Sequence, residues 1–493
     1  MSVSSTAVSA VSLPAAQPVE RAAPERSINL THLGVIVAGA AAIRLLVPVP
    51  AGLDDKSWSL LIVFLGALAG LVIQPAPMGV VFLSAITVAV ITGTLTPAQA
   101  LAGYSNNILW LIVIAFMFAR AFVKTGLGRR IALLIIRRIG TSSLRLGYSL
   151  SLTDLVLAPV TASNTARAGA IVFPIAVSVS REFDSTPGPS ASRIGAFLLF
   201  TAYQANLVTS ALFLTAMASN PLAAEFARQI ANVDISWSGW LAASSVPGLV
   251  SFLVVPYAIY KLLPPEIQHT PQAKRYADSE LERLGPASRQ EQLLAVVFVT
   301  LAAVWGAQQL LGVDTTIAGL AGLCALLLAG VLKWDDVVGE TRAWDTLVWW
   351  GAMMSLAAAL NQSLVTKWFA TLAGDSLAGW TALPALIALV VAYTYIHYAF
   401  AGQTAHVVAL YPPFLTVAVA LGAPPLLAAL LLCFFSNLNS TLTHYSDGAA
   451  PIFYGSGYIE QRAWWRVGFY LSVLHLVIWL GVGLAWWKFL GIW

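Results

Sequence analysis

Charged residues are scarce in this chain of 493 residues. Lysine, arginine, aspartate and glutamate together make up 10% of the sequence, whereas hydrophobic residues make up 58%. The mean hydropathy is +0.79. Soluble globular proteins carry about 25% charged residues, so this composition excludes that class. We expect an all-α polytopic membrane protein that is surrounded by the lipid bilayer.

Cysteine is nearly absent as well. The two cysteines, Cys324 and Cys433, each lie within an apolar run, and no HExxH pattern occurs. We therefore expect no disulfide framework, no metal site and no other cofactor. A membrane-embedded enzyme that binds a metal through its histidines is an unfavoured alternative, because the histidines are scattered through the predicted spans.

The net charge of +4 does not indicate a nucleic-acid partner, because the basic residues gather in loops beside apolar segments. Such a distribution is typical of membrane topology. One stretch is basic and contains no acidic residue: Lys124, Arg129, Arg130, Arg137, Arg138 and Arg145. We expect it to be cytoplasmic, together with a disordered N-terminal tail (1–28) and a charged linker (264–290). The protein is predicted to lie in the inner (plasma) membrane.

Eleven apolar segments have roughly the ~20 residues that a membrane-spanning helix needs. They are 31–50, 57–74, 77–97, 106–125, 191–218, 238–263, 291–312, 315–333, 345–362, 424–458 and 465–490. Two further apolar regions, 129–181 and 366–421, are too long for one span and are interrupted by polar residues. Each is predicted to be a re-entrant helical hairpin, because a break at membrane depth must be buried in protein or face a watery cavity.

The two hairpins belong to an internal repeat. When the chain is shifted by 239 residues, ASNTARAGAIVFP (162–174) aligns with AGQTAHVVALYPP (401–413), and Trp110 aligns with Trp349. The predicted topology brings the hairpins in from opposite faces, which is the inverted-repeat architecture of secondary transporters. The halves are 29–263 and 291–493, and each contains scaffold helices, a hairpin and a span broken by polar residues.

Polar residues at the hairpin tips and in the broken spans indicate a binding site. Residues such as Ser and Asn cap the free N–H groups of a helix that begins there, and two convergent helix N-termini favour an anion. Hydroxyl and amide groups from the broken spans would orient a small polar ligand. The predicted substrate-binding residues from these four segments are Ser163, Asn164, Thr165, Asn206, Thr209, Ser210, Gln403, Thr404, Ser440, Thr441 and Thr443.

The motifs SNTARAG, AWDTLVWWG (343–351), TAHVVALYP (404–412) and STLTHYSDGAAPIFYGSGY (440–458) resemble the divalent anion/sodium symporter family. The most similar branch contains bacterial citrate, tartrate and succinate exchangers and the plastid 2-oxoglutarate/malate translocator. The resemblance implies a homodimer, an elevator mechanism and carboxylate-binding Ser-Asn-Thr tips, and it adds His444 to the expected site. This chain departs from the family at Gly402-Gln403-Thr404, where the symporters keep a second Ser-Asn-Thr.

Both tips carry a basic residue two positions beyond the shared threonine: Arg167 in the first repeat and His406 in the second. A charge at membrane depth costs at least ~2.5 kcal/mol on insertion scales. We interpret both side chains as charge compensation in place of the sodium ions that the symporters bind at their tips. A local pair of Arg167 with Asp154 or Asp447 is the open alternative.

These features predict sodium-independent, obligate exchange of C4 and C5 dicarboxylates such as malate, succinate, fumarate and 2-oxoglutarate. An empty carrier with uncompensated positive charge would stall in the low-dielectric barrier, whereas a loaded carrier would cross. The alternatives are a sodium- or proton-coupled di- or tricarboxylate symporter and a permease for arsenite or another inorganic anion.

Overall fold

The computed structural model describes residues 28–493 except 366–367, 369–370 and 372–380. Its described part contains helices and no strand. Most of the predicted N-terminal tail and part of the region 366–421 lie outside the described residues. This all-α architecture confirms the predicted fold class.

The first part of the chain forms α1 (Leu30–Leu46), α2 (Asp55–Ile73), α3 (Met78–Ile91), α4 (Pro97–Leu101), η1 (Ala102–Ser105) and α5 (Asn107–Thr125). Its counterpart in the second half is α14 (Arg289–Gly306), α15 (Gln308–Leu311), α16 (Thr315–Leu328), α17 (Trp334–Val338) and α18 (Thr341–Gln362). These two groups pack together, because α18 lies against α3, η1 and α5, and α16 lies against α5. Gly103 permits the closest approach, since a Cβ atom there would lie 2.1 Å from the carbonyl oxygen of Gly351.

The first polar break is built by α6 (Leu127–Ile139), α7 (Ser143–Leu157), η2 (Ala158–Val160), α8 (Asn164–Ala166), the π-helical η3 (Arg167–Val172) and α9 (Phe173–Arg181). The two arms of the hairpin therefore span 143–181. The amphipathic α6 precedes the first arm: the chain turns at Gly140, and α6 packs against both α7 and α13 (Pro271–Leu284). The predicted region 129–181 therefore contains α6 in addition to the two arms, and its boundaries stay a prediction.

The helices that follow this hairpin are η4 (Pro189–Arg193), α10 (Gly195–Leu212), η5 (Leu214–Ala216), α11 (Ser219–Ala231) and α12 (Trp237–Leu262). Those of the chain's last part are α20 (Ala382–Ile396), η6 (His397–Ala399), α21 (Gln403–Ala420), α22 (Pro425–Leu438), η7 (Asn439–Thr441), α23 (Ala450–Gly455), α24 (Gln461–Val477), the π-helical η8 (Ile478–Gly483) and α25 (Leu484–Phe489).

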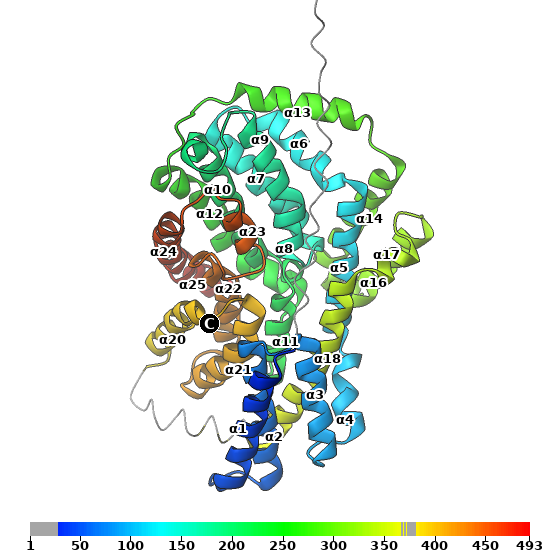
Figure 1. The fold of residues 1–493 in the computed structure, drawn as a ribbon, viewed down its shortest axis with the longest axis vertical. Helices are drawn as coiled ribbons and strands as arrows, with labels where there is room; N and C mark the ends of the chain where they lie inside the picture. Colours follow the sequence, from blue (N-terminus) through cyan, green and yellow to red (C-terminus); the bar gives the residue numbers. More distant parts are fainter. Residues whose placement is uncertain (1–27, 366–367, 369–370, 372–380) are drawn as a thin grey trace, which may run out of the picture.

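Helix α10 is the centre of the part that carries the two tips. All of its residues are buried, and it packs against α7, α9, α12 and α22. Helix α22 is buried from Leu427 to its end and also contacts α11, α20 and α21. In Figure 1, α20, α22, α24 and α25 lie on the left of the molecule and α3, α5, α16 and α18 on the right. The tips, at the starts of α8 and α21, face α3, α5 and α18 across the middle of the protein.

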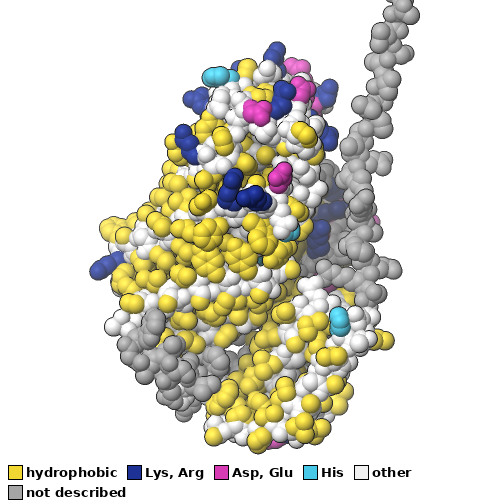
Figure 2. Space-filling model, turned by 60° about the vertical axis from the view of Figure 1, so that its left-hand side comes forward, with side chains coloured by type: hydrophobic (Ala, Val, Ile, Leu, Met, Phe, Trp, Pro, Cys, Tyr) yellow, Lys and Arg dark blue, Asp and Glu magenta, His cyan; other side chains and the backbone are white. Residues whose placement is uncertain are grey.

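The surface agrees with a membrane protein. Figure 2 shows hydrophobic side chains over the middle and lower parts of one face, with most of its charged side chains towards the upper end. Six described helical segments are long and apolar enough to cross a membrane, and a seventh is obtained if α13 and α14, bent by 113°, count as one span. Four of the six, α2, α5, α12 and α24 to α25, coincide with predicted spans. The total of eleven stays a prediction.

Candidate functional site

The first tip lies between α7 and α8. Ser163 caps α8, because its hydroxyl accepts a hydrogen bond from the backbone N–H of Ala166 at 3.1 Å. Gly448 from the second half packs closely on this tip: a Cβ atom there would lie 2.5 Å from the hydroxyl of Thr165. The glycine therefore lets the break after α22 approach the tip more closely than any other residue would allow.

The second tip is capped differently. Helix α21 begins at Gln403 after Gly402, whose backbone is extended, and among the described residues no side chain caps this helix end. The first N–H groups of a helix have no partner within it. The first turn of α21 therefore offers backbone N–H donors that no side chain in the described part of the chain satisfies. In the first tip, by contrast, Ser163 accepts a hydrogen bond from one of the equivalent donors.

The two tips meet at equivalent positions of the repeat. Asn164 and Gln403 are 239 residues apart, and Asn164 Nδ2 lies 3.5 Å from Gln403 Oε1. The same nitrogen donates to Asp447 Oδ2 at 2.9 Å, while Gln403 Nε2 donates to the carbonyl oxygen of Asn437 at 3.1 Å. Both amides are thus held by groups from the last turn of α22 and from the break that follows it.

A cavity of about 380 Å³ opens between the tips and α18. Five predicted site residues line it: Ser163, Asn164, Thr165, Gln403 and Thr404. Its wall also includes residues that the sequence prediction missed: Gln74, Met78, Phe116, Met217, Leu222, Arg342, Asp345, Thr346, Trp349, Trp350 and Asp447. Its size is within the range of small-molecule sites. The cavity combines apolar walls with hydroxyl and amide groups, as a site for a small anion requires.

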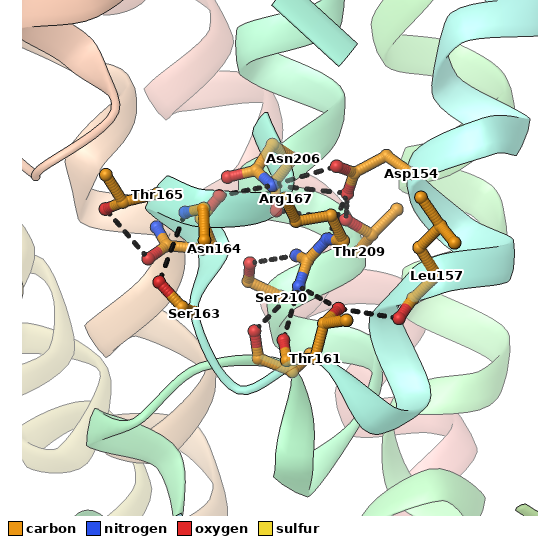
Figure 3. Close-up of polar contacts among 12 residues, drawn as sticks. Asp154, Leu157, Thr161, Ser163, Asn164, Thr165, Arg167, Asn206, Thr209 and Ser210 are labelled. Carbon is orange, nitrogen blue, oxygen red and sulfur yellow. Dashed lines mark hydrogen bonds and ion pairs between the residues drawn. The ribbon is translucent and has the colours of Figure 1, made fainter. Parts of the chain in front are cut away.

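Arg167 lies behind the first tip and is fully buried (Figure 3). Its Nε lies 3.0 Å from Asp154 Oδ2. Its Nη1 donates to the carbonyl oxygens of Thr161 and Ala216, both at 2.9 Å, and its Nη2 donates to the hydroxyl of Ser210 at 2.9 Å. The guanidinium therefore occupies a shell of oxygen atoms, and Asp154 compensates its charge.

This pairing corrects one element of the sequence interpretation. The charge of Arg167 was expected to be uncompensated in the empty protein, and that expectation is wrong because Asp154 from the other arm of the hairpin pairs with it. Asn206 donates to both oxygens of Asp154, at 3.0 and 3.3 Å, and the hydroxyl of Thr209 donates to Oδ2. These residues organise the ion pair and do not line the cavity.

His406 occupies the equivalent place behind the second tip, but its surroundings differ. The repeat offset of 239 aligns Arg167 with His406 and Asp154 with Tyr393. The imidazole is fully buried, and neither ring nitrogen has a hydrogen-bond partner among the described residues. The rings of Tyr393 and His397 lie 4.3 and 4.9 Å away, centroid to centroid. An ion pair in the first repeat thus corresponds to an aromatic contact in the second.

The remaining predicted residues lie in the break after α22, outside the cavity wall. The hydroxyl of Ser440 lies 3.4 Å from His397 Nε2, whereas the hydroxyls of Thr441 and Thr443 have no partner among the described residues. His444 Nδ1 accepts a hydrogen bond from Trp465 Nε1 at 3.0 Å. Their role in substrate binding stays a prediction.

A family model described as the sodium:sulfate symporter transmembrane region matches residues 28–493. The chain belongs to the divalent anion/sodium symporter family. It is therefore a multi-pass membrane transporter and not an enzyme. This result confirms the resemblance inferred from the tip and broken-span motifs.

Several named relatives match nearly the whole transporter. It is 46% identical to the "Putative malate transporter YflS" of Bacillus subtilis, over 96% of this chain and 99% of that protein. It is 41% identical to dicarboxylate transporter 1, chloroplastic, of Arabidopsis thaliana, over 99% of this chain and 88% of that protein. It is 35% identical to the L-tartrate/succinate antiporter of Shigella sonnei, over 90% of this chain and 95% of that protein.

The transporter's fold resembles that of a solved structure. The YdaH transporter of Alcanivorax borkumensis superposes with a TM-score of 0.52, over 95% of this chain and 98% of that one, at 14% sequence identity. At this identity the likeness concerns the fold alone.

Proposed function

We propose that this transporter exchanges C4 and C5 dicarboxylates, such as malate, succinate, fumarate and 2-oxoglutarate, one for one and without sodium. The names of the relatives support this substrate class. The name of the Shigella relative supports exchange. The proposed setting is a homodimer in the inner membrane with a cytoplasmic N-terminus.

The observation that carries the sodium-independence is the position of Arg167. Its guanidinium lies among the carbonyl oxygens of Thr161 and Ala216, the hydroxyl of Ser210 and the carboxylate of Asp154. Oxygen shells of this kind also suit a small hard cation. A permanently charged side chain in this shell leaves no room for an exchangeable ion. His406 lacks such a shell, because neither of its ring nitrogens has a hydrogen-bond partner among the described residues. It is proposed to supply a positive charge behind the second tip only when it is protonated.

The substrate is proposed to bind between the tips. One carboxylate would accept hydrogen bonds from the first turn of α21 and from Thr165 and Thr404, which line the cavity. These donors bind carboxylate groups and contact little of the carbon chain that joins the two carboxylates. Several dicarboxylates would therefore fit. Met217 and Trp349 would pack against that chain.

Obligate exchange follows from the unpaired donors rather than from the charge of Arg167. Crossing the membrane barrier removes water from the empty site, and each buried donor left without a partner costs about 1–3 kcal/mol. A bound dicarboxylate satisfies these donors. The loaded carrier therefore crosses, by the elevator movement that we propose for this family member, while the empty carrier stalls.

Proton-coupled symport is the second candidate, because Asp447 brings a buried carboxyl group into the cavity wall. Sodium-free proteoliposomes distinguish the two. We expect labelled 2-oxoglutarate to enter vesicles loaded with malate and not empty vesicles, with or without a pH gradient or added sodium. Uptake into empty vesicles that follows an imposed pH gradient would support the symporter instead.

A further inference from the structure

Arg342 is the one basic side chain among the described residues that line the cavity. Among the described residues that line the cavity, the charged ones are Arg342, Asp345 and Asp447. Arg342 lies in the first turn of α18, and its side chain is exposed. Helix α18 does not carry either tip, so this charge reaches the substrate cavity from the opposite wall.

The two carboxylates of the cavity wall differ from each other in their surroundings. Asp447 is 3% exposed. It accepts hydrogen bonds from Asn164 at 2.9 Å and from the backbone N–H groups of Ala449 and Ala450 at 3.1 and 2.7 Å. Its oxygens are therefore engaged by the protein. Asp345 lies one turn after Arg342 on the same helix and is exposed with it.

Other charged groups near α18 leave Arg342 available. Lys124 and Arg120 pair with Asp336 on the neighbouring α17. Burial raises the pKa of Glu340 just before α18, although the charges of Arg342 and Arg120 lower it to a smaller extent. Arg342 forms none of the ion pairs found within the described part of the chain.

We propose that Arg342 captures one carboxylate of an incoming dicarboxylate while the tips bind the other. A guanidinium donates two parallel hydrogen bonds to a carboxylate, which fixes orientation as well as charge. The tips offer neutral donors, so the second carboxylate of a dianion needs a cationic partner on the far wall. This inference rests on the proposed function, because it assumes that dicarboxylates enter this cavity.

The position of Arg342 makes the contact one-sided. Helix α18 packs against α3, η1 and α5, whereas the tips pack with α10, α11 and α22. If the tips move past α18, a substrate that leaves with them also leaves Arg342. Arg342 lies at the end of α18 that the predicted topology places on the cytoplasmic side. The residue then favours entry from that side and contributes nothing on the other side.

The test compares Arg342→Gln, Arg342→Lys and a control, Arg462→Gln, whose exposed arginine does not line the cavity. The KM for labelled succinate is measured at low and high ionic strength in exchange assays, separately for each face of the membrane. We expect Arg342→Gln to raise the KM on one face about fivefold at low ionic strength and to abolish most of its salt dependence. Arg342→Lys should keep a KM and a salt dependence close to those of the wild-type protein.

An unchanged KM and salt dependence in Arg342→Gln would overturn the inference, as would an equal loss in the control. Equal increases on both faces would also contradict it. Gel filtration checks that the variants fold, and the exposed position of Arg342 makes a folding defect unexpected. Failure of the wild-type protein to exchange dicarboxylates would instead refute the proposed function, so the two failures are distinguishable.

Discussion

Asn164 Nδ2 lies 3.5 Å from Gln403 Oε1, across the point where the two repeats meet. The distance is at the long limit of a hydrogen bond, so the contact is weak. Asp447 and the carbonyl oxygen of Asn437 hold the outer side of each amide. A substrate carboxylate can therefore replace the weak contact between the tips without disturbing the stronger bonds that position them.

The threonine of the second tip is expected to bind substrate. Thr404→Val removes a hydroxyl that lines the cavity, and the loss of one hydrogen bond to a charged group should raise the KM for a dicarboxylate about tenfold. The matched control is Thr416→Val on the same helix, whose hydroxyl bonds to the carbonyl oxygen of Pro412. Exchange kinetics of both variants check this prediction. A KM for Thr404→Val equal to that for Thr416→Val would contradict it.

The buried pair of Arg167 and Asp154 is expected to behave as a unit in stability measurements. Removing one partner of a buried ion pair costs about 3–5 kcal/mol, because the other charge stays buried and unpaired. Arg167→Met and Asp154→Leu should each lower the thermal midpoint in detergent, and the double variant should be more stable than either single variant. A double variant whose loss equals the sum of the two single losses would show that the charges act independently.

Removal of the guanidinium should create a sodium site. Arg167→Ala leaves the carboxylate of Asp154 facing the carbonyl oxygens of Thr161 and Ala216, which now bind the side chain. Sodium chloride, compared with choline chloride, should then raise the thermal midpoint of this variant in a concentration-dependent way and leave the wild-type protein unchanged. The control is Arg167→Ala with Asp154→Leu, which lacks the carboxylate. The same response in both variants would argue against the site.

The site was predictable from the sequence where its signal is local. Ser163, Asn164 and Thr165 interrupt an apolar region, and the repeat assigns Gln403 and Thr404 to the second tip. All five line one cavity. A polar break within a membrane-spanning region must be buried in protein or face a cavity. Such a break is visible in a few consecutive residues, so the sequence alone reveals it.

The rest depends on contacts between distant segments. The sequence left two partners open for Arg167, Asp154 and Asp447, and only the packing of α7 against η3 selects Asp154. Arg342 and Asp447 lie far from the first tip in the chain, and no motif marked Arg342 as a cavity residue. The start of the first hairpin is not marked in the sequence for a similar reason: α6 is amphipathic and contains apolar runs, and only the structure shows that it packs against both α7 and α13.

The central claim is that a dicarboxylate crosses only when another returns. Its most direct test is a two-label flux measurement in sodium-free proteoliposomes with the membrane potential clamped at zero. Vesicles are loaded with one labelled dicarboxylate, and the uptake of a second, differently labelled one is counted against its release. The account predicts one molecule released for each molecule taken up, at every external concentration. Uptake that proceeds without release, or that increases when sodium is added, would contradict it.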